Sequence, residues 1–467
     1  MKRIWILLIG TVLLIGLALT WRLGQQRETR TLRLPDGSQL TLLKVTYGTN
    51  HVCVYGSWWQ NLRDSLLVRF KGATIPSRSA SFTSTDTNSV MLWLRQDQTL
   101  PWQAWPPIYY LAVADENDLE SKLKQSANVS INLRAANAAR SPPPGVTPGT
   151  GSGLPSLITG WELPQHPRRA KEFKIRLYRG ESNGNVVRVG ELTVRNPSSG
   201  KFPTWPAETL PAKRQMNNLE ITLTKLETGL TGKEVGRAPA GEGAKSFSRA
   251  TFTVKENGAP TEKWSVCGIR LSNAAGEVRP AGTYVSRWER AEHIVNFEGG
   301  LWLEESAWKL EMAFARTGAF PPEERWLIKG VPVPRPGELI EMRVVTNRFN
   351  VELEFLGVSG PNAKMSEGYT AMQPYANIHV RSPHPLDDLR IVLVEVRDDR
   401  GASANLQGSS STTSTGGRGI TPKEMLYGFG LDIPEDAKML DVTLAATRIV
   451  SVEFLAKPSL TQARLGD

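Results

Sequence analysis

Apolar and polar residues alternate in short runs along almost the whole chain after residue 30. The first two runs flank Pro35-Asp36-Gly37, and alternating residues around an Asp-Gly pair predict a β-hairpin. Short strands separated by turn residues are typical of antiparallel β-sandwiches. Further strands are predicted at Val90–Leu94, Ile108–Ala114, Phe173–Tyr178, Val186–Val194, Leu219–Leu226, Ala250–Val254, Lys309–Phe314, Leu339–Thr346, Val351–Leu356, Ala376–Val380, Leu389–Val396 and Val450–Leu455. The pattern therefore predicts a mainly β fold with two or more antiparallel β-sandwich (Ig-like) domains.

Three segments have helical signals instead. Ser57 is a candidate cap for a helix over residues 58–66, where Trp and Leu residues recur at helical spacing. Residues 118–125 predict a second short helix. Thr421-Pro422-Lys423-Glu424 resembles a capping box with Pro at the first helical position, so we expect one or two helical turns there. The first two helices make the N-terminal domain a small mixed α/β domain.

Composition along the chain suggests the domain boundaries. The run of Pro, Gly and Ser after residue 140 cannot form regular structure and predicts a linker. Two other segments rich in small residues predict flexible excursions within domains. The expected organisation is an anchor and stalk over 1–30, a β-rich α/β domain over 31–135, the linker over 136–157, a β-sandwich region over 158–334 with a mobile insertion at 229–245, a C-terminal β-sandwich over 335–458 with a Ser/Thr/Gly loop at 403–420, and a tail over 459–467.

A weak internal repeat accompanies this organisation. Phe173-Lys-Ile-Arg-Leu resembles Trp308-Lys-Leu-Glu-Met, and each segment is followed by a Trp with a Pro six positions later. These are Trp205 with Pro211 and Trp326 with Pro332, offset by 121 residues, about the length of one sandwich domain. The sequence leaves duplication and coincidence both open.

The N-terminus predicts export and anchoring. Residues 4–21 contain no charge, follow Lys2 and Arg3, and would form a helix of ~27 Å, close to the ~30 Å thickness of the hydrocarbon core. The stretch is longer than a signal-peptide core and lacks a good cleavage site, so we expect a retained single-pass helix with the body outside the cytoplasm, periplasmic or extracellular. Cleavage, which would release a secreted body, is the alternative.

The net charge of +10 does not indicate a nucleic-acid partner. Residues 1–30 contribute +4 of it, and the remaining excess is spread thinly without a long basic run. The two cysteines, Cys53 and Cys267, fall in apolar strand-like segments of different predicted domains, which favours two buried thiols over a pair.

No motif predicts a catalytic, cofactor or metal site. Ser121-x-x-Lys124 lacks the companion signatures of Ser-Lys enzymes, and the five histidines are scattered. Three pairs of adjacent acids are Glu304-Glu305, Asp387-Asp388 and Asp398-Asp399. Adjacent residues of a strand point to opposite faces, so the two acids of one pair cannot flank one glycosidic bond. The best candidates for ligand binding are Trp102 and Trp105, set among prolines in a predicted loop, because exposed rings can stack on sugars or proline-rich peptides.

One segment resembles a known family. Residues 32–42, read as LRLPDGSQLTL, resemble the opening of the periplasmic domain in FecR-type membrane anti-sigma factors. The resemblance covers 11 residues and implies envelope signalling through a cytoplasmic segment, whereas only Met1 to Arg3 are expected on that side.

The sequence thus predicts a non-enzymatic, membrane-anchored extracytoplasmic protein with a structural, adhesive or protein- or glycan-binding role. The alternative is an extracytoplasmic glycan-active or other hydrolytic enzyme whose acids meet only in the folded chain.

Overall fold

The architecture comes from a computed structural model. It describes residues 31–54 (except 36), 79–97 (except 85–87), 109–132 (except 123–126), 156–180 (except 164), 186–235 (except 199 and 233), 246–279, 284–289, 292–363, 374–381, 388–414 (except 404) and 424–461 (except 435). Over these ranges the chain forms thirty strands and one 3-10 turn, η1 (Pro322–Glu324), without an α-helix.

The expectation of a mixed α/β N-terminal domain is therefore not met in the described part of the chain. Within the predicted second helix, residues 120–122 form a strand, and residues 424–432, after the predicted capping box, form another. Part of the predicted Ser/Thr/Gly loop is likewise a strand, at residues 405–414. The helix at 58–66 and the anchor at 4–21 lie outside the described residues. Among those that are described, no helix has the length and apolarity to cross a membrane.

The first module, residues 31–198, contains two main sheets that face each other across a core. One sheet has the order β1-β2-β5-β9-β8 and the other β11-β10-β6-β7, with β3 and β4 as a separate hairpin. The strands are β1 (Thr31–Arg33), β2 (Gln39–Tyr47), β3 (Asn50–Val54), β4 (Ser79–Thr83), β5 (Val90–Asp97), β6 (Tyr109–Ala114), β7 (Glu120–Lys122), β8 (Ala127–Asn132), β9 (Ser156–Leu163), β10 (Glu172–Gly180) and β11 (Val186–Arg195).

The second module, residues 200–317 together with 450–461, is built from two further sheets. The larger has the path β12-β13-β14-β19-β18, with β15 beside β14 and β30 beside β13, and the smaller has the order β17-β16-β20-β29. The strands are β12 (Ala212–Met216), β13 (Leu219–Leu230), β14 (Phe247–Glu256), β15 (Ala259–Pro260), β16 (Trp264–Asn273), β17 (Val278–Arg279), β18 (Tyr284–Glu289), β19 (Glu292–Glu298), β20 (Trp308–Arg316), β29 (Val450–Ala456) and β30 (Ser459–Leu460).

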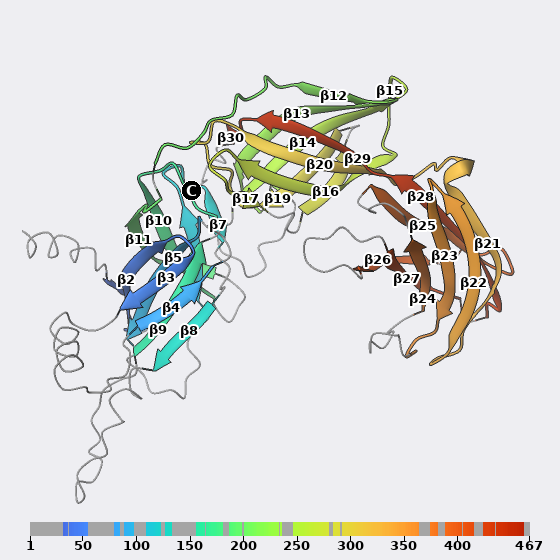
Figure 1. Cartoon of the computed structure of the whole chain (residues 1–467), viewed down its shortest axis with the longest axis horizontal. Helices are drawn as coiled ribbons and strands as arrows, with labels where there is room; N and C mark the ends of the chain where they lie inside the picture. The colour runs from blue at the N-terminus through green and yellow to red at the C-terminus, as the bar shows by residue number, and fades with distance from the viewer. Residues whose placement is uncertain are drawn as a thin grey trace, which may run out of the picture.

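The third module, residues 320–449, pairs the sheet β21-β28-β25 with the sheet β22-β23-β24-β27-β26 around a separate core. Figure 1 shows the three modules following one another, with the red strands of the C-terminus lying on the second module and not at the end of the third. The strands are β21 (Arg325–Pro332), β22 (Leu339–Arg348), β23 (Val351–Ser359), β24 (Tyr375–Arg381), β25 (Leu389–Asp398), β26 (Asn405–Ser414), β27 (Glu424–Asp432) and β28 (Met439–Arg448).

Strand pairing does not follow the predicted domain boundaries. β9 follows the predicted linker at 136–157, yet it pairs with β5 and β8, which precede that linker. The linker sequence therefore connects two neighbouring strands of one sheet. The predicted boundary at residue 334 is also displaced, because β21 lies before it and belongs to the third module.

All three modules share one strand order. Each has three consecutive sheet neighbours, a crossing to the opposite sheet, a hairpin whose second strand pairs with the third strand, and a second crossing. The three sets, in this order, are β1, β2, β5, β6, β8, β9, β10; β12, β13, β14, β16, β18, β19, β20; and β22, β23, β24, β25, β26, β27, β28. The two segments that look alike in sequence, Phe173–Leu177 and Trp308–Met312, lie in the equivalent strands β10 and β20.

A turn after the first crossing strand repeats as well. Asp115, Asn273 and Asp398 each accept, through the side-chain Oδ1, a hydrogen bond from the backbone N–H four residues later, at 2.9, 2.9 and 2.7 Å. The residue at the third position after each has a positive φ of 61°, 84° and 83°, and in the second and third modules it is Gly. A short acidic or amide side chain that holds a tight turn closed explains these residue types.

Candidate functional site

The predicted ligand residues cannot be assigned a geometry, because Trp102 and Trp105 lie outside the described residues. Of the acids considered earlier, Asp398 closes the turn described above, while Glu304 and Glu305 lie between the first and second modules. The densest group of buried charges in the described ranges surrounds that pair. We call it the polar junction.

The polar junction is formed by loops of both modules. The first module contributes the β6–β7 turn (115–119) and the β9–β10 connection (165–171). The second contributes the β16–β17 turn (274–277) and the β19–β20 connection (299–307). All four loops connect the opposite sheets or lie at their ends, so the two sandwiches meet end to end.

Backbone contacts fix the approach of the two modules. The N–H of Gly300 donates to the carbonyl oxygen of Glu120 at 2.9 Å, and the N–H of Glu120 donates to Ser246 Oγ at 2.9 Å. A Cβ atom at position 300 would lie 2.7 Å from the Cβ of Leu119, so the close approach requires glycine there. The hydrophobic core also runs through this contact, since buried side chains of both modules belong to one cluster.

Two consecutive arginines of the first module reach into the second. The Arg168 side chain is 1% exposed, and its Nη1 donates to the carbonyl oxygen of Ala275 at 2.9 Å. Arg169 Nε donates to Glu305 Oε2 at 2.8 Å, and Glu305 is 1% exposed. Burial raises the pKa of Glu305, and the hydrogen bond and charge of Arg169 oppose that rise. The pair therefore joins the modules through a largely dehydrated ion pair.

A second buried pair lies within the second module behind this contact. Glu277 is fully buried and accepts from Arg279 Nε at 2.9 Å, from Trp302 Nε1 at 2.9 Å and from Asn273 Nδ2 at 3.1 Å. The Arg279 guanidinium lies 5.2 and 5.0 Å from the ring centres of Trp302 and Trp308. The Glu277 carboxylate thus receives three hydrogen bonds, one of them from a guanidinium that two tryptophan rings also stabilise.

A third charged group supports the β6–β7 turn from inside the first module. Arg176 pairs with Asp118, Glu120 and Glu191, and the Tyr178 hydroxyl donates to Glu120 at 2.6 Å. Burial raises the pKa of Glu120, while the hydrogen bonds from Arg176 and Tyr178 lower it. This group orients the strand whose backbone contacts Gly300.

Glu304 is the unusual ionisable group of the polar junction. Burial, followed by the negative charges of Glu116, Asp115 and Glu305, raises its pKa to about 7, against the smaller opposing effect of Arg169. Its buried Oε2 has no hydrogen-bond partner within the described part of the chain. A carboxyl group that titrates near neutral pH is the type of group used in general acid–base catalysis.

A second requirement of catalysis is a reacting partner, and the one buried His–Ser pair in the described part of this region does not provide it. His166 Nε2 lies 3.0 Å from Ser198 Oγ, but both side chains are buried, and that hydroxyl donates to Asn196 Oδ1 at 2.6 Å. In a catalytic triad the third residue orients the histidine and leaves the serine free to react. Burial lowers the pKa of His166 to about 3, so the imidazole is a neutral structural group that ties the β9–β10 connection to the turn after β11.

Two further histidines, His51 and His293, and the two cysteines lie within strands. His51 and His293 are fully buried, and His293 stacks on Trp288 at 4.7 Å. No group of three His, Cys, Asp or Glu residues among the described positions could hold a metal ion. Cys53 and Cys267 lie in different sheets and are free thiols.

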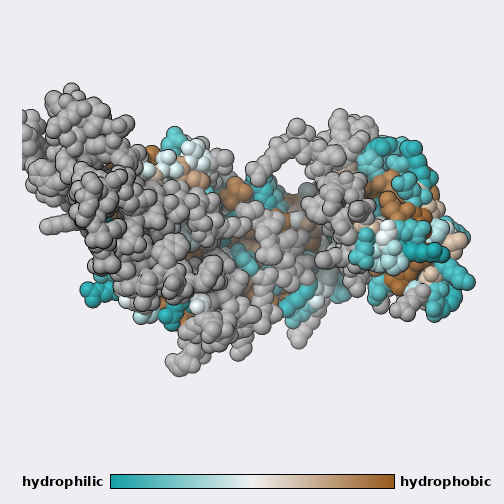
Figure 2. Space-filling model, turned by 90° about the horizontal axis from the view of Figure 1, so that it is seen from below, coloured by the Kyte–Doolittle hydropathy of each residue, from teal (hydrophilic) through white to brown (hydrophobic). Residues whose placement is uncertain are grey.

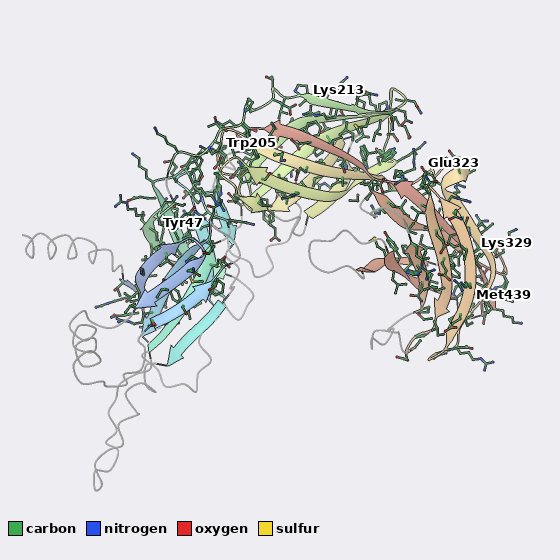
Figure 3. All side chains as sticks on the ribbon, in the orientation of Figure 1. Tyr47, Trp205, Lys213, Glu323, Lys329 and Met439 are labelled. Carbon is green, nitrogen blue, oxygen red and sulfur yellow. The ribbon has the colours of Figure 1, made fainter. Side chains whose placement is uncertain are left out.

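The exposed apolar residues that the structure describes on the third module lie on both of its sheets. Leu327 and Met439 lie on the β21-β28-β25 sheet, whereas Leu339 and Val345 lie on β22, an edge of the opposite sheet. Figure 2 shows brown hydrophobic patches interrupted by hydrophilic residues on this module, and Figure 3 places Met439 and Lys329 on its outer side. Isolated apolar residues of this kind are ordinary for a protein surface.

Comparison with protein-family models, curated proteins and solved structures finds no match to this chain.

Proposed function

We propose that this protein is a membrane-anchored extracytoplasmic protein with a structural or adhesive role, built to hold a protein or glycan at a distance from the membrane. The observation that carries the proposal is the polar junction. It joins the first two sandwiches through buried ion pairs, backbone hydrogen bonds and a shared core, where a flexible linker would leave them independent. Such a joint suits a protein that transmits position or force.

The strand order supports an Ig-like class of sandwich within this proposal. In immunoglobulin-type domains one sheet has the order A-B-E-D and the other C-F-G. In the third module, β23-β24-β27-β26 and β25-β28-β21 have corresponding neighbours. Many cell-surface domains share this sandwich architecture.

The uncharged segment 4–21 supports the membrane placement, and the two loop tryptophans, Trp102 and Trp105, are the proposed ligand contacts. An external protease added to intact cells or spheroplasts should degrade a tagged body while a cytoplasmic control protein survives. Protection of the body would refute the placement.

Binding can be tested separately on the purified body with glycan and peptidoglycan fractions and with proline-rich peptides. Trp102→Ala and Trp105→Ala should each lower binding about tenfold, because the stacking of a sugar or proline ring on the indole is lost. Trp205→Ala is the matched control, since Trp205 is a partly exposed tryptophan at the second module. Equal binding by all three variants would refute the ligand assignment.

An extracytoplasmic hydrolase is the second candidate, and Glu304 is the observation that favours it. Its pKa near 7 fits a general acid. If this candidate holds, the wild-type body should release soluble fragments from glycans and Glu304→Gln should abolish that release. Absence of release by the wild type leaves the structural role.

A further inference from the structure

In the second and third modules, the strand that completes the smaller sheet does not follow its sheet neighbour along the chain. In the first module β11 follows β10 along the chain and pairs with it, which completes the smaller sheet. In the second module the equivalent strand β20 is followed by β21, but β21 pairs with β28 of the third module. In turn β28 is followed by β29, which pairs with β20 of the second.

We propose that the second and third modules form a single folding unit that is closed by reciprocal exchange of their last strands. The third module is thereby attached through two crossing chain segments, residues 317–324 and Ile449, and is held as a fixed head on the second. This inference concerns how the chain assembles and holds for either candidate function.

The length of one crossing segment explains why the exchange occurs. Only Ile449 separates β28 from β29. The commonest β-hairpin connections contain two residues and the next commonest are longer, so a connection of one residue disfavours a hairpin between β28 and β29. In the first module residues 181–185 separate β10 from β11, and the chain reverses there. β29 therefore extends away from β28 and pairs with β20 of the second module.

Each exchanged strand fills the core of the module that receives it. From β29, Phe454 and Ala456 are fully buried, and the Phe454 ring lies 6.0 Å from that of Phe252. From β21, Ile328 and Val331 are 2% and 0% exposed in the core of the third module. Without the strand from its neighbour, each module would lose core side chains as well as a row of backbone hydrogen bonds.

Side-chain contacts hold the crossing region in place. Arg316, at the end of β20, pairs with Glu256 and lies over the Trp264 ring at 4.8 Å. Oε2 of Glu324, the last residue of η1 before β21, lies 3.8 Å from Nε of Arg316. On the second crossing the N–H of Ile449 donates to the carbonyl oxygen of Asp388 at 2.7 Å. Figure 3 places the neighbouring Glu323 where the second and third modules meet.

Engineered cysteine pairs distinguish strand exchange from the alternative, a hairpin between β28 and β29, and the control pair reuses one position from each of the other two pairs. In the full-length body with Cys53→Ser and Cys267→Ser, Leu327→Cys/Thr443→Cys tests the β21–β28 pairing, and Lys309→Cys/Leu455→Cys tests the β20–β29 pairing. The matched control is Thr443→Cys/Leu455→Cys, which would face each other only if β28 and β29 formed a hairpin. A short bifunctional thiol reagent removes any dependence on disulfide geometry.

We expect the first two pairs to cross-link within a monomer and the control pair to remain unlinked, as read by non-reducing electrophoresis and peptide mass spectrometry. Cross-linking of the control pair, or cross-linking between chains, would overturn the exchange within one chain.

The single folding unit has its own test by hydrogen exchange. Phe355→Ala opens the core of the third module, where Phe355 is fully buried. Amide protection should fall by a similar factor in β28 and in β20, although β20 lies in the other module. Loss of protection in β28 with wild-type protection in β20 would refute a single unit even if the cross-links form.

Discussion

The buried carboxylate of Glu277 offers a quantitative test of the polar junction. Glu277→Ala removes the partner of a guanidinium that is 3% exposed and leaves Trp302 Nε1 without its acceptor. Breaking a buried pair by removal of one partner costs about 3–5 kcal/mol, because the other charge stays buried and uncompensated. We therefore expect Glu277→Ala to lower the free energy of unfolding by about that amount.

Urea unfolding followed by tryptophan fluorescence measures this effect. With an m-value of about 3 kcal/mol/M, the midpoint should fall by roughly 1 M or more. Glu289→Ala is the matched control, since Glu289 pairs with Arg287 but the two side chains are 52% and 44% exposed. Such exposed pairs contribute about 0–1 kcal/mol. If both variants shift the midpoint equally, Glu277 does not neutralise a buried charge and the account of the polar junction is wrong.

Three further predictions concern other parts of the molecule. Gly357→Ala should lower the free energy of unfolding by about 4 kcal/mol or more, because its Cβ would lie 1.8 Å from a carbonyl oxygen of β22, and circular dichroism should show the third module unfolded. The control Gly401→Ala, also at positive φ but in open space, should lower it by only about 1 kcal/mol. The pKa of Glu304 is 4.5 in the unfolded chain and about 7 in the folded protein, so the stability that this group contributes is fully present below pH 4.5 and is lost as pH rises through about 7. Between pH 5 and 8 the wild type should therefore lose stability relative to Glu304→Gln. Parallel pH profiles of the two proteins would contradict this. Cys53, whose pKa burial raises to about 11, should react with a thiol reagent only after unfolding, and rapid labelling of Cys53 in the native protein would contradict its burial.

The sequence predicts the strands better than their partners. Alternation identifies β10 and β20, because burial on one face leaves a period of two in each strand by itself. The assignment of β9 to the first module could not be predicted, because its hydrogen bonds to β5 span the Pro/Gly/Ser segment that we interpreted as a linker. The pairing of two strands that a long loop separates leaves little pattern in the local sequence of either strand.

The polar junction was missed for the same reason. Arg168 and its acceptor Ala275 are far apart in sequence, and a single arginine before a strand resembles a surface residue. A usable signal was present in the three turns. Asp115, Asn273 and Asp398 each end a strand with an acid or amide, and a Gly or Asp follows three residues later. The same spacing also occurs at Asn296 and Gly299, so it indicates this turn only together with its place after the first crossing strand.

The return of β29 to the second module has a consequence for the order of synthesis. Domains usually fold from the N-terminus while the chain is being made. Here residues 200–317 emerge early, but the sheet they form lacks its last strand until residue 456 is available. The second module therefore remains incomplete during production of the whole third module. A chain that stops before residue 450 would lack a strand in the middle of the molecule, and the damage would appear more than a hundred residues before the point of truncation.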